Sequence, residues 1–181
     1  MERTEEEEKD LKIKINNILS IYAGTHKFHN FTSKLNSTDP SVNRYMRSFH
    51  CESIIKIKDQ SFCVFKISGQ SFLLHQIRKM FSLAIWVMRT KNEDKIKEIM
   101  NGAESPHFFN IPKAPGFPLI LLSCNYNGYD EKWANRNIVT SFDINQPQVN
   151  QFKETFIYSN IHSQENGEKG FFFSPFFIFF C

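Results

Sequence analysis

The chain has 181 residues, which is the size of one domain or of a large piece of a bigger protein. Hydrophobic residues make up 41% of it and charged residues 23%, so it can bury a core and is not disordered as a whole. Its longest apolar run, around Phe81–Met88, is far shorter than the roughly 20 residues that span a bilayer, so we expect no transmembrane helix.

Charge is unevenly distributed along the chain. The formal net charge is +3, but residues 1–10 carry −4, which leaves +7 on residues 11–181. A mildly basic body permits a polyanionic partner without demonstrating one. No C-x-x-C pair or zinc-ribbon spacing occurs among the four cysteines, which indicates a reducing compartment. His26 and His29 have the spacing of some metal ligands, but no second ligand pair follows, so we predict no metal site.

The first predicted element is a helix. Residues 1–10 are rich in Glu and Lys, and they are either a solvated leader or the charged first turn of that helix. Apolar residues then recur at helical spacing from Leu11 to Tyr22, so we predict an amphipathic helix over residues 5–23 that ends at Gly24. The polar stretch over residues 25–41 is predicted to be a loop. It is long for a compact domain, which suggests a functional role.

Two β-like runs follow, at residues 43–58 and 61–68, joined by a short turn. In the second run Cys63, Phe65 and Ile67 share one face, whereas the alternate residues Val64, Lys66 and Ser68 share the other. This period of two predicts an antiparallel hairpin with one well-buried face.

A second long helix is predicted over residues 72–89, with Ser71 placed to cap its start. Apolar residues form a wide stripe along it, and His75, Arg78 and Ser82 form a second line. An arginine inside an otherwise apolar helical stretch needs a partner, because an unpaired buried charge costs several kcal/mol.

The remaining elements are short. We predict a helix over residues 93–101, a proline-rich loop over residues 103–118 and a last strand over residues 119–125. This order predicts an α+β fold with a mostly antiparallel sheet and helices packed on one face. We expect a charged leader at residues 1–10, one domain at residues 11–130, and a polar, then Phe-rich tail at residues 131–181 that is poorly ordered.

Four segments carry a family resemblance: GTHKFHNFT at residues 24–32, DPSVNRY at 39–45, GQSFLLHQIRKM at 69–80 and KAPG at 113–116. In this order and spacing they closely resemble the C-terminal half of the TruA family of tRNA pseudouridine synthases, nearest to the eukaryotic multisite enzymes. The resemblance implies half of a pseudouridine synthase catalytic core. It also implies a cofactor-free isomerase that breaks the N-glycosidic bond of a uridine in tRNA and rejoins the base through carbon 5.

The resemblance also implies roles for individual residues. In the family an aspartate carboxylate is the key catalytic group, and the target base is flipped into a pocket. An arginine at the position of Arg78 pairs with that aspartate. A leucine at about the position of Leu119 packs against the flipped base, with Ile120 and Leu121 as alternatives. Basic residues of the matched segments are candidates for RNA contacts, although a structural role stays open for the histidines: His26, Lys27, His29, His75 and Lys79.

One part of the family pattern is not found. The aspartate motif G-R-T-D-x-G-V-H-A and the base-stacking tyrosine belong to the family's N-terminal half, and Asp39 lies in a different context. We therefore expect the C-terminal part of an enzyme, without a nucleophile and inactive alone, with tRNA and the N-terminal half of the same enzyme as partners. The alternative is a non-catalytic RNA-binding module, and a third interpretation is an α+β scaffold without an RNA role. The resemblance implies a nuclear location, in some relatives also mitochondrial, and leaves the modified uridines and the oligomeric state open.

Overall fold

The computed structural model describes residues 4–57, 60–90, 109–116, 119–124, 126–133, 135, 146–160 and 176–180. Its strands form one five-stranded sheet in the order β1-β2-β3-β5-β4. The strands are β1 (Gly24–Lys27), β2 (Asn43–Ile57), β3 (Gln60–Gly69), β4 (Leu119–Leu121) and β5 (Phe176–Phe180). The hairpin of β2 and β3 and the strand at residue 119 thus lie in the same sheet, with β5 between them.

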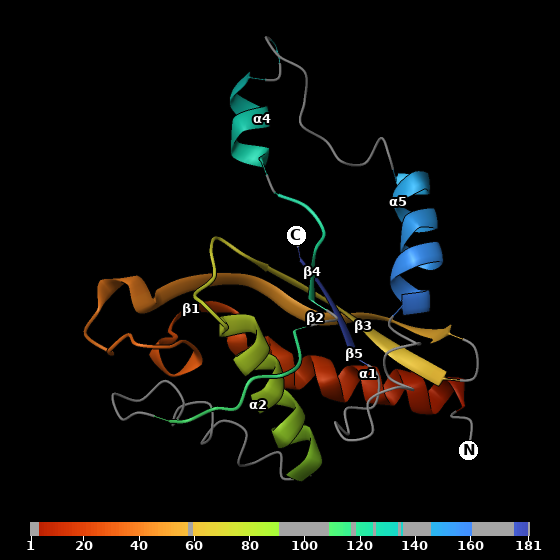
Figure 1. Ribbon diagram of the computed structural model, residues 1–181, viewed down its shortest axis with the longest axis horizontal. Coiled ribbons are helices and arrows are strands. Elements are labelled where there is room, and N and C mark those ends of the chain that lie inside the picture. Colours follow the sequence, from red (N-terminus) through yellow and green to blue (C-terminus); the bar gives the residue numbers. More distant parts are fainter. Residues whose placement is uncertain are drawn as a thin grey trace.

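Strands β1, β2 and β3 are antiparallel neighbours, whereas β5 pairs in parallel with both β3 and β4. Helices α1 (Glu5–Leu19) and α2 (Gln76–Thr90) lie together on one side of the sheet, as predicted (Figure 1). Helices α4 (Asn127–Trp133) and α5 (Gln146–Phe152) stand on the other side, and a π-helical segment continues α5 over Lys153–Tyr158. The α+β fold class is confirmed. In the described part of the chain no helix is long and apolar enough to cross a membrane.

Helix α1 begins with a capping box. The Thr4 hydroxyl accepts from the Glu7 amide at 3.3 Å, and the Glu7 carboxylate accepts from the Thr4 amide at 2.8 Å. Four glutamates occupy the first turn, where negative charge favours the positive end of the helix dipole. Residues 5–10 are therefore helical, which favours the second of the two interpretations of the charged start. The buried face of α1 consists of Ile15, Ile18 and Leu19.

The predicted faces of β3 are confirmed, but both are covered. Cys63, Phe65 and Ile67 lie in the main core, which also holds the buried residues of α1 and α2. On the opposite face Phe62 and Val64 are also buried, and Ile157 and Tyr158 of the π-helical segment are among the residues packed against them. The expectation of a single buried face was therefore wrong, because a segment almost a hundred residues further along the chain covers the other face.

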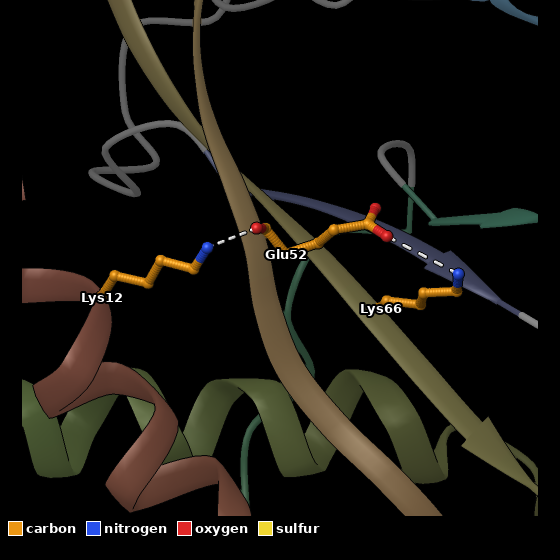
Figure 2. A network of polar contacts seen from close by, with 3 residues as sticks. All are labelled: Lys12, Glu52 and Lys66. Carbon is orange, nitrogen blue, oxygen red and sulfur yellow. Dashed lines mark hydrogen bonds and ion pairs between the residues drawn. The ribbon is translucent and has the colours of Figure 1, made fainter. Parts of the chain in front are cut away.

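The outer edge of β2 is protected by side chains of α1. Strand β1 pairs only with residues 43–46 of β2, so the backbone beyond that point has no strand neighbour on this side within the described ranges. The Asn16 side chain takes the place of a strand there: its Oδ1 accepts from the Cys51 amide at 2.7 Å, and its Nδ2 donates to the Cys51 carbonyl at 3.5 Å. Lys12 donates to the Glu52 carbonyl, while the Glu52 carboxylate lies 3.6 Å from Lys66 Nζ on β3 (Figure 2).

Several predicted boundaries are corrected. The stretch over residues 25–41 is not all loop, because β1 forms in it by pairing with β2. Helix α2 begins at Gln76, four residues later than predicted, and the last strand ends at Leu121 rather than at residue 125. The predicted helix over residues 93–101 lies outside the described residues. Elements α5 and β5 lie in the predicted tail, and the domain limits at residues 11 and 131 stay predictions.

Candidate functional site

The start of α2 has an unusual backbone. His75 has a φ of 66°, in the left-handed region that residues other than glycine rarely occupy. The fully buried Gln76 side chain caps the turn, since its Oε1 accepts from the Leu73 amide at 2.8 Å. This bond fixes the turn before α2, and the helix does not begin at the predicted cap Ser71. Backbone strain of this kind concentrates at functional sites, where the surrounding structure holds it in place.

Arg78 lies in the first turn of α2 and contacts the segment over residues 109–116. Its Nε donates to the Ala114 carbonyl at 2.6 Å, and the Ala114 amide donates to the Arg78 carbonyl at 3.2 Å. A Cβ at Gly116 would lie 3.5 Å from Cζ and Nη1, an ordinary contact distance, so this glycine lies beside the guanidinium. The partner that the sequence requires for this arginine is therefore, at Nε, a backbone carbonyl. Among the described residues no partner binds Nη1 or Nη2, and these N–H groups are the ones that bind a carboxylate in two-pronged fashion.

Positive charges gather around Arg78. Partial desolvation lowers the pKa of His75 below its ordinary value of 6.5, and the cations Lys113, Arg78 and Lys79 lower it further. The only ion pair within the described residues is the distant one between Lys66 and Glu52. The site is therefore a cluster of cations whose arrangement favours an anionic group from outside the described residues.

Lys79 is buried instead of facing RNA. Only 6% of its surface is exposed, and Nζ donates to the carbonyls of Asn30 at 3.0 Å and Thr32 at 2.9 Å. Burial, followed by the charge of Lys113, lowers the pKa of Lys79. The ammonium group is thus enclosed by backbone oxygens. This arrangement fixes the loop that contains Asn30 and Thr32 and leaves the ammonium group unable to bind a phosphate. The predicted RNA contact does not fit this position.

The histidines and the lysine of the first matched segment have different surroundings. His26 is half-buried, with Nε2 2.8 Å from the Ala23 carbonyl and its ring edge-on to Phe28. Lys27 is exposed at the end of β1. His29 is 3% exposed, and neither of its ring nitrogens has a hydrogen-bond partner in the described part of the chain. Of these three, only Lys27 is freely placed for a phosphate.

Leu119 is the best placed of the three candidates for base packing. Its amide donates to the Gly116 carbonyl at 3.2 Å, and its side chain is partly buried against the main core. Ile120 packs on the opposite face with the second cluster, and Leu121 is 68% exposed. Leu119 is therefore the one joined directly to the glycine that touches Arg78. Its contact with a base stays a prediction.

The structure also brings in residues that sequence reasoning did not select as site residues. Lys113 lowers the pKa of both His75 and Lys79, Gly116 lies beside the guanidinium, and Asn30 binds both Lys79 and the Phe109 amide. All three lie inside segments that resemble the family, at residues 24–32 and 113–116. Their position in those segments was the sequence signal that could have identified them as site residues. No cluster of His, Cys, Asp or Glu that could hold a metal ion occurs in the described ranges.

The charge of Lys113 gives a testable effect on His75. Replacing Lys113 by Gln removes a cation that disfavours the imidazolium, so the pKa of His75 should rise towards 6.5. It should stay below that value, because desolvation still acts. An NMR titration of the histidine ring from pH ~5 to ~8 measures the shift. The control is Lys27→Gln, an exposed lysine that does not act on His75, and an equal shift in both variants would contradict the cluster.

Comparison of the sequence with known proteins identifies the family of this chain. A profile of the family described as tRNA pseudouridine synthase matches residues 18–127. The Pseudouridylate synthase 1 homolog of Mus musculus is 35% identical over 157 residues, covering 86% of this chain and 36% of the mouse protein. The tRNA pseudouridine synthase 1 of Yarrowia lipolytica is 41% identical over 160 residues, covering 87% of this chain and 30% of that protein. The chain thus spans about a third of the length of these curated relatives, and it belongs to the tRNA pseudouridine synthase family.

Proposed function

We propose that this chain is the C-terminal part of a tRNA pseudouridine synthase and that Arg78 orients a catalytic aspartate supplied by the N-terminal part. The observation that carries the proposal is the placement of the guanidinium. Its Nε is held by the Ala114 carbonyl against Gly116, while its Nη groups bind no described residue. A surrounding cluster of cations, to which the described residues contribute no acid, is a suitable receptor for a carboxylate or a phosphate.

In the proposed reaction, the bond between N1 of uracil and the ribose breaks, and a bond from C5 to the same carbon forms. N1 gains a proton and C5 loses one to solvent, so the product is an isomer. The arginine lowers the pKa of the facing aspartate, which keeps the carboxylate ionised and aimed at the flipped nucleotide. Leu119 packs against the base, while Lys27, His75 and Lys113 contact phosphates. We further propose that the enzyme acts in the nucleus.

The proposal is tested with a fusion enzyme, in which the full 181-residue chain follows the part of the mouse relative that precedes the matched region. The substrate is tRNA carrying tritium at C5 of its uridines, because each turnover then releases one tritium to water. We expect the fusion enzyme to release tritium and the isolated chain to release none. A fusion enzyme that folds and binds tRNA but releases no tritium would contradict the catalytic role.

The second candidate function is a non-catalytic RNA-binding module. It is favoured by the cation cluster, to which the described residues contribute no carboxylate. This candidate predicts that the isolated chain prefers folded tRNA over an unstructured RNA of equal length at moderate salt. Equal affinity for both RNAs, lost together as salt rises, would indicate only non-specific attraction to phosphates.

Charge reversal at Lys27 tests the RNA-facing surface. Lys27→Glu should weaken tRNA binding and reduce the slope of log affinity against log salt by about one, because one phosphate contact is lost. The same change at Lys14, an exposed lysine on α1, is the control for net charge. Fluorescence anisotropy over a range of salt measures both effects. If Lys27→Glu has the same slope as the unmodified chain, β1 does not contact RNA.

A further inference from the structure

Asn30 lies where three parts of the structure meet. It is fully buried in the 3-10 turn His29–Phe31. Its backbone carbonyl accepts from Lys79 Nζ at 3.0 Å, which joins the turn to α2. Its side-chain Oδ1 accepts from the Phe109 amide at 2.6 Å, which joins the turn to the segment over residues 109–116. Asn30 therefore connects α2 to the segment that contacts Arg78.

The segment over residues 109–116 contains no helix or strand, so no hydrogen-bonded ladder positions it. At its start it is held by Asn30, and towards its end by the two hydrogen bonds between Ala114 and Arg78. Between these points the side chains of Ile111 and Ala114 are buried in the main core. An irregular segment with so few anchors should depend strongly on each of them.

The two anchors use neighbouring residues of α2. Arg78 contacts the segment, while Lys79 holds the backbone oxygens of Asn30 and Thr32. The Thr32 hydroxyl adds a third link, donating to the Leu74 carbonyl at 3.0 Å. The loop that carries Asn30 is thus fastened to the same turn of α2 from which the arginine extends. A shift of the loop would move the Ala114 carbonyl relative to Arg78.

We propose that Asn30 is a positioning residue for Arg78. Its side chain fixes the segment over residues 109–116 against α2. The Ala114 carbonyl then sets the orientation of the guanidinium, and the Nη groups are directed at the carboxylate of the proposed catalytic aspartate. The catalytic consequence rests on the proposed function, whereas the anchoring of Arg78 does not.

The anchoring is tested on the full chain by NMR of the arginine Nε–H groups, with the Arg78 signal identified by its loss in Arg78→Lys. We expect this proton to exchange slowly with water, because it is bonded to the Ala114 carbonyl. Asn30→Ala should speed its exchange by about tenfold or more, since the segment loses its first anchor. Asn30→Asp keeps the acceptor oxygen and should stay within about threefold of the unmodified chain.

Two further variants make the result specific. Asn16→Ala removes another asparagine that bonds to the backbone, but at the β2 edge, and should leave Arg78 unchanged. Phe109→Pro removes the donor of the Asn30 bond without touching the core, because the Phe109 side chain is 55% exposed, and should reproduce the loss. Unchanged exchange of Arg78 in folded Asn30→Ala, or in Phe109→Pro if the first variant does not fold, would overturn the proposal.

The effect of Asn30 on catalysis is measured in the fusion enzyme. Asn30→Ala should lower turnover by about tenfold with little change in tRNA affinity, because the charge of Arg78 remains and only its aim is lost. In the Arg78→Ala background the same change should have no additional effect. Faster Arg78 exchange with unchanged turnover would support the anchoring and contradict the proposed function. A full additional loss in the Arg78→Ala background would contradict the positioning role.

Discussion

Replacing Arg78 by Ala in the fusion enzyme should lower single-turnover pseudouridine formation on the order of 10²–10³-fold, the usual cost of losing one electrostatic group in an active site. Affinity for tRNA should fall much less, because many phosphate contacts share the binding energy. The structural reason is that Arg78 is held at Nε by Ala114, while its Nη groups bind no described residue and remain to aim a carboxylate. Tritium release at saturating enzyme and tRNA binding should be measured on the same preparations.

Arg78→Lys separates charge from geometry. The lysine keeps the positive charge but has neither the two-pronged donor set nor an equivalent of the Nε bond to Ala114, so most of the loss should remain. Arg89, about three turns further along α2, is the matched control, and Arg89→Ala should keep turnover close to that of the fusion enzyme. Near-normal turnover in Arg78→Ala would return this arginine to a structural role.

Phe65→Ala should have the largest effect on stability. Phe65 is completely buried on β3, and its ring packs edge-on against Phe49 of β2 at 6.4 Å and Phe81 of α2 at 5.1 Å. Truncation removes the contacts that join the hairpin to α2 and leaves a cavity, so the free energy of unfolding should fall by about 3–5 kcal/mol. Urea denaturation followed by circular dichroism measures the change.

The control for this experiment is Phe152→Ala. Phe152 lies at the end of α5 and is 57% exposed, so its truncation should change the free energy of unfolding by less than about 1 kcal/mol. Equal losses in the two variants would mean that the core does not lie between β3 and α2. The Phe65 variant should be examined in the isolated chain, where the stability is not shared with an N-terminal part.

The local sequence pattern was sufficient to predict the buried faces of α1 and β3, because the apolar periodicity of each element lies within a few residues. The alternation along residues 61–68 predicted which side chains of β3 face the main core, and the helical spacing of Ile15, Ile18 and Leu19 predicted the buried face of α1. These predictions succeed because side-chain direction in a strand or helix follows from backbone geometry alone. The four matched segments indicated the family, and the family profile over residues 18–127 confirms it.

Long-range contacts decided the rest. Gly24–Lys27 is a strand only because β2 supplies its hydrogen bonds, and the second face of β3 is buried only because Ile157 and Tyr158 reach it. Helix α2 begins at Gln76 because the preceding His75 has a left-handed backbone, which a continuous α-helix cannot include.

The same distinction applies to the site. Sequence alone showed that an arginine on an apolar helix needs a partner, since burying an unpaired charge is costly. It could not show that the partner is the carbonyl of Ala114, that Gly116 lies beside the guanidinium, or that the neighbouring Lys79 faces inward to Asn30 and Thr32. Those contacts join residues 36 to 49 positions apart. Only the tertiary packing of the loop and of residues 109–116 against α2 determines which of two adjacent cations is enclosed and which is presented.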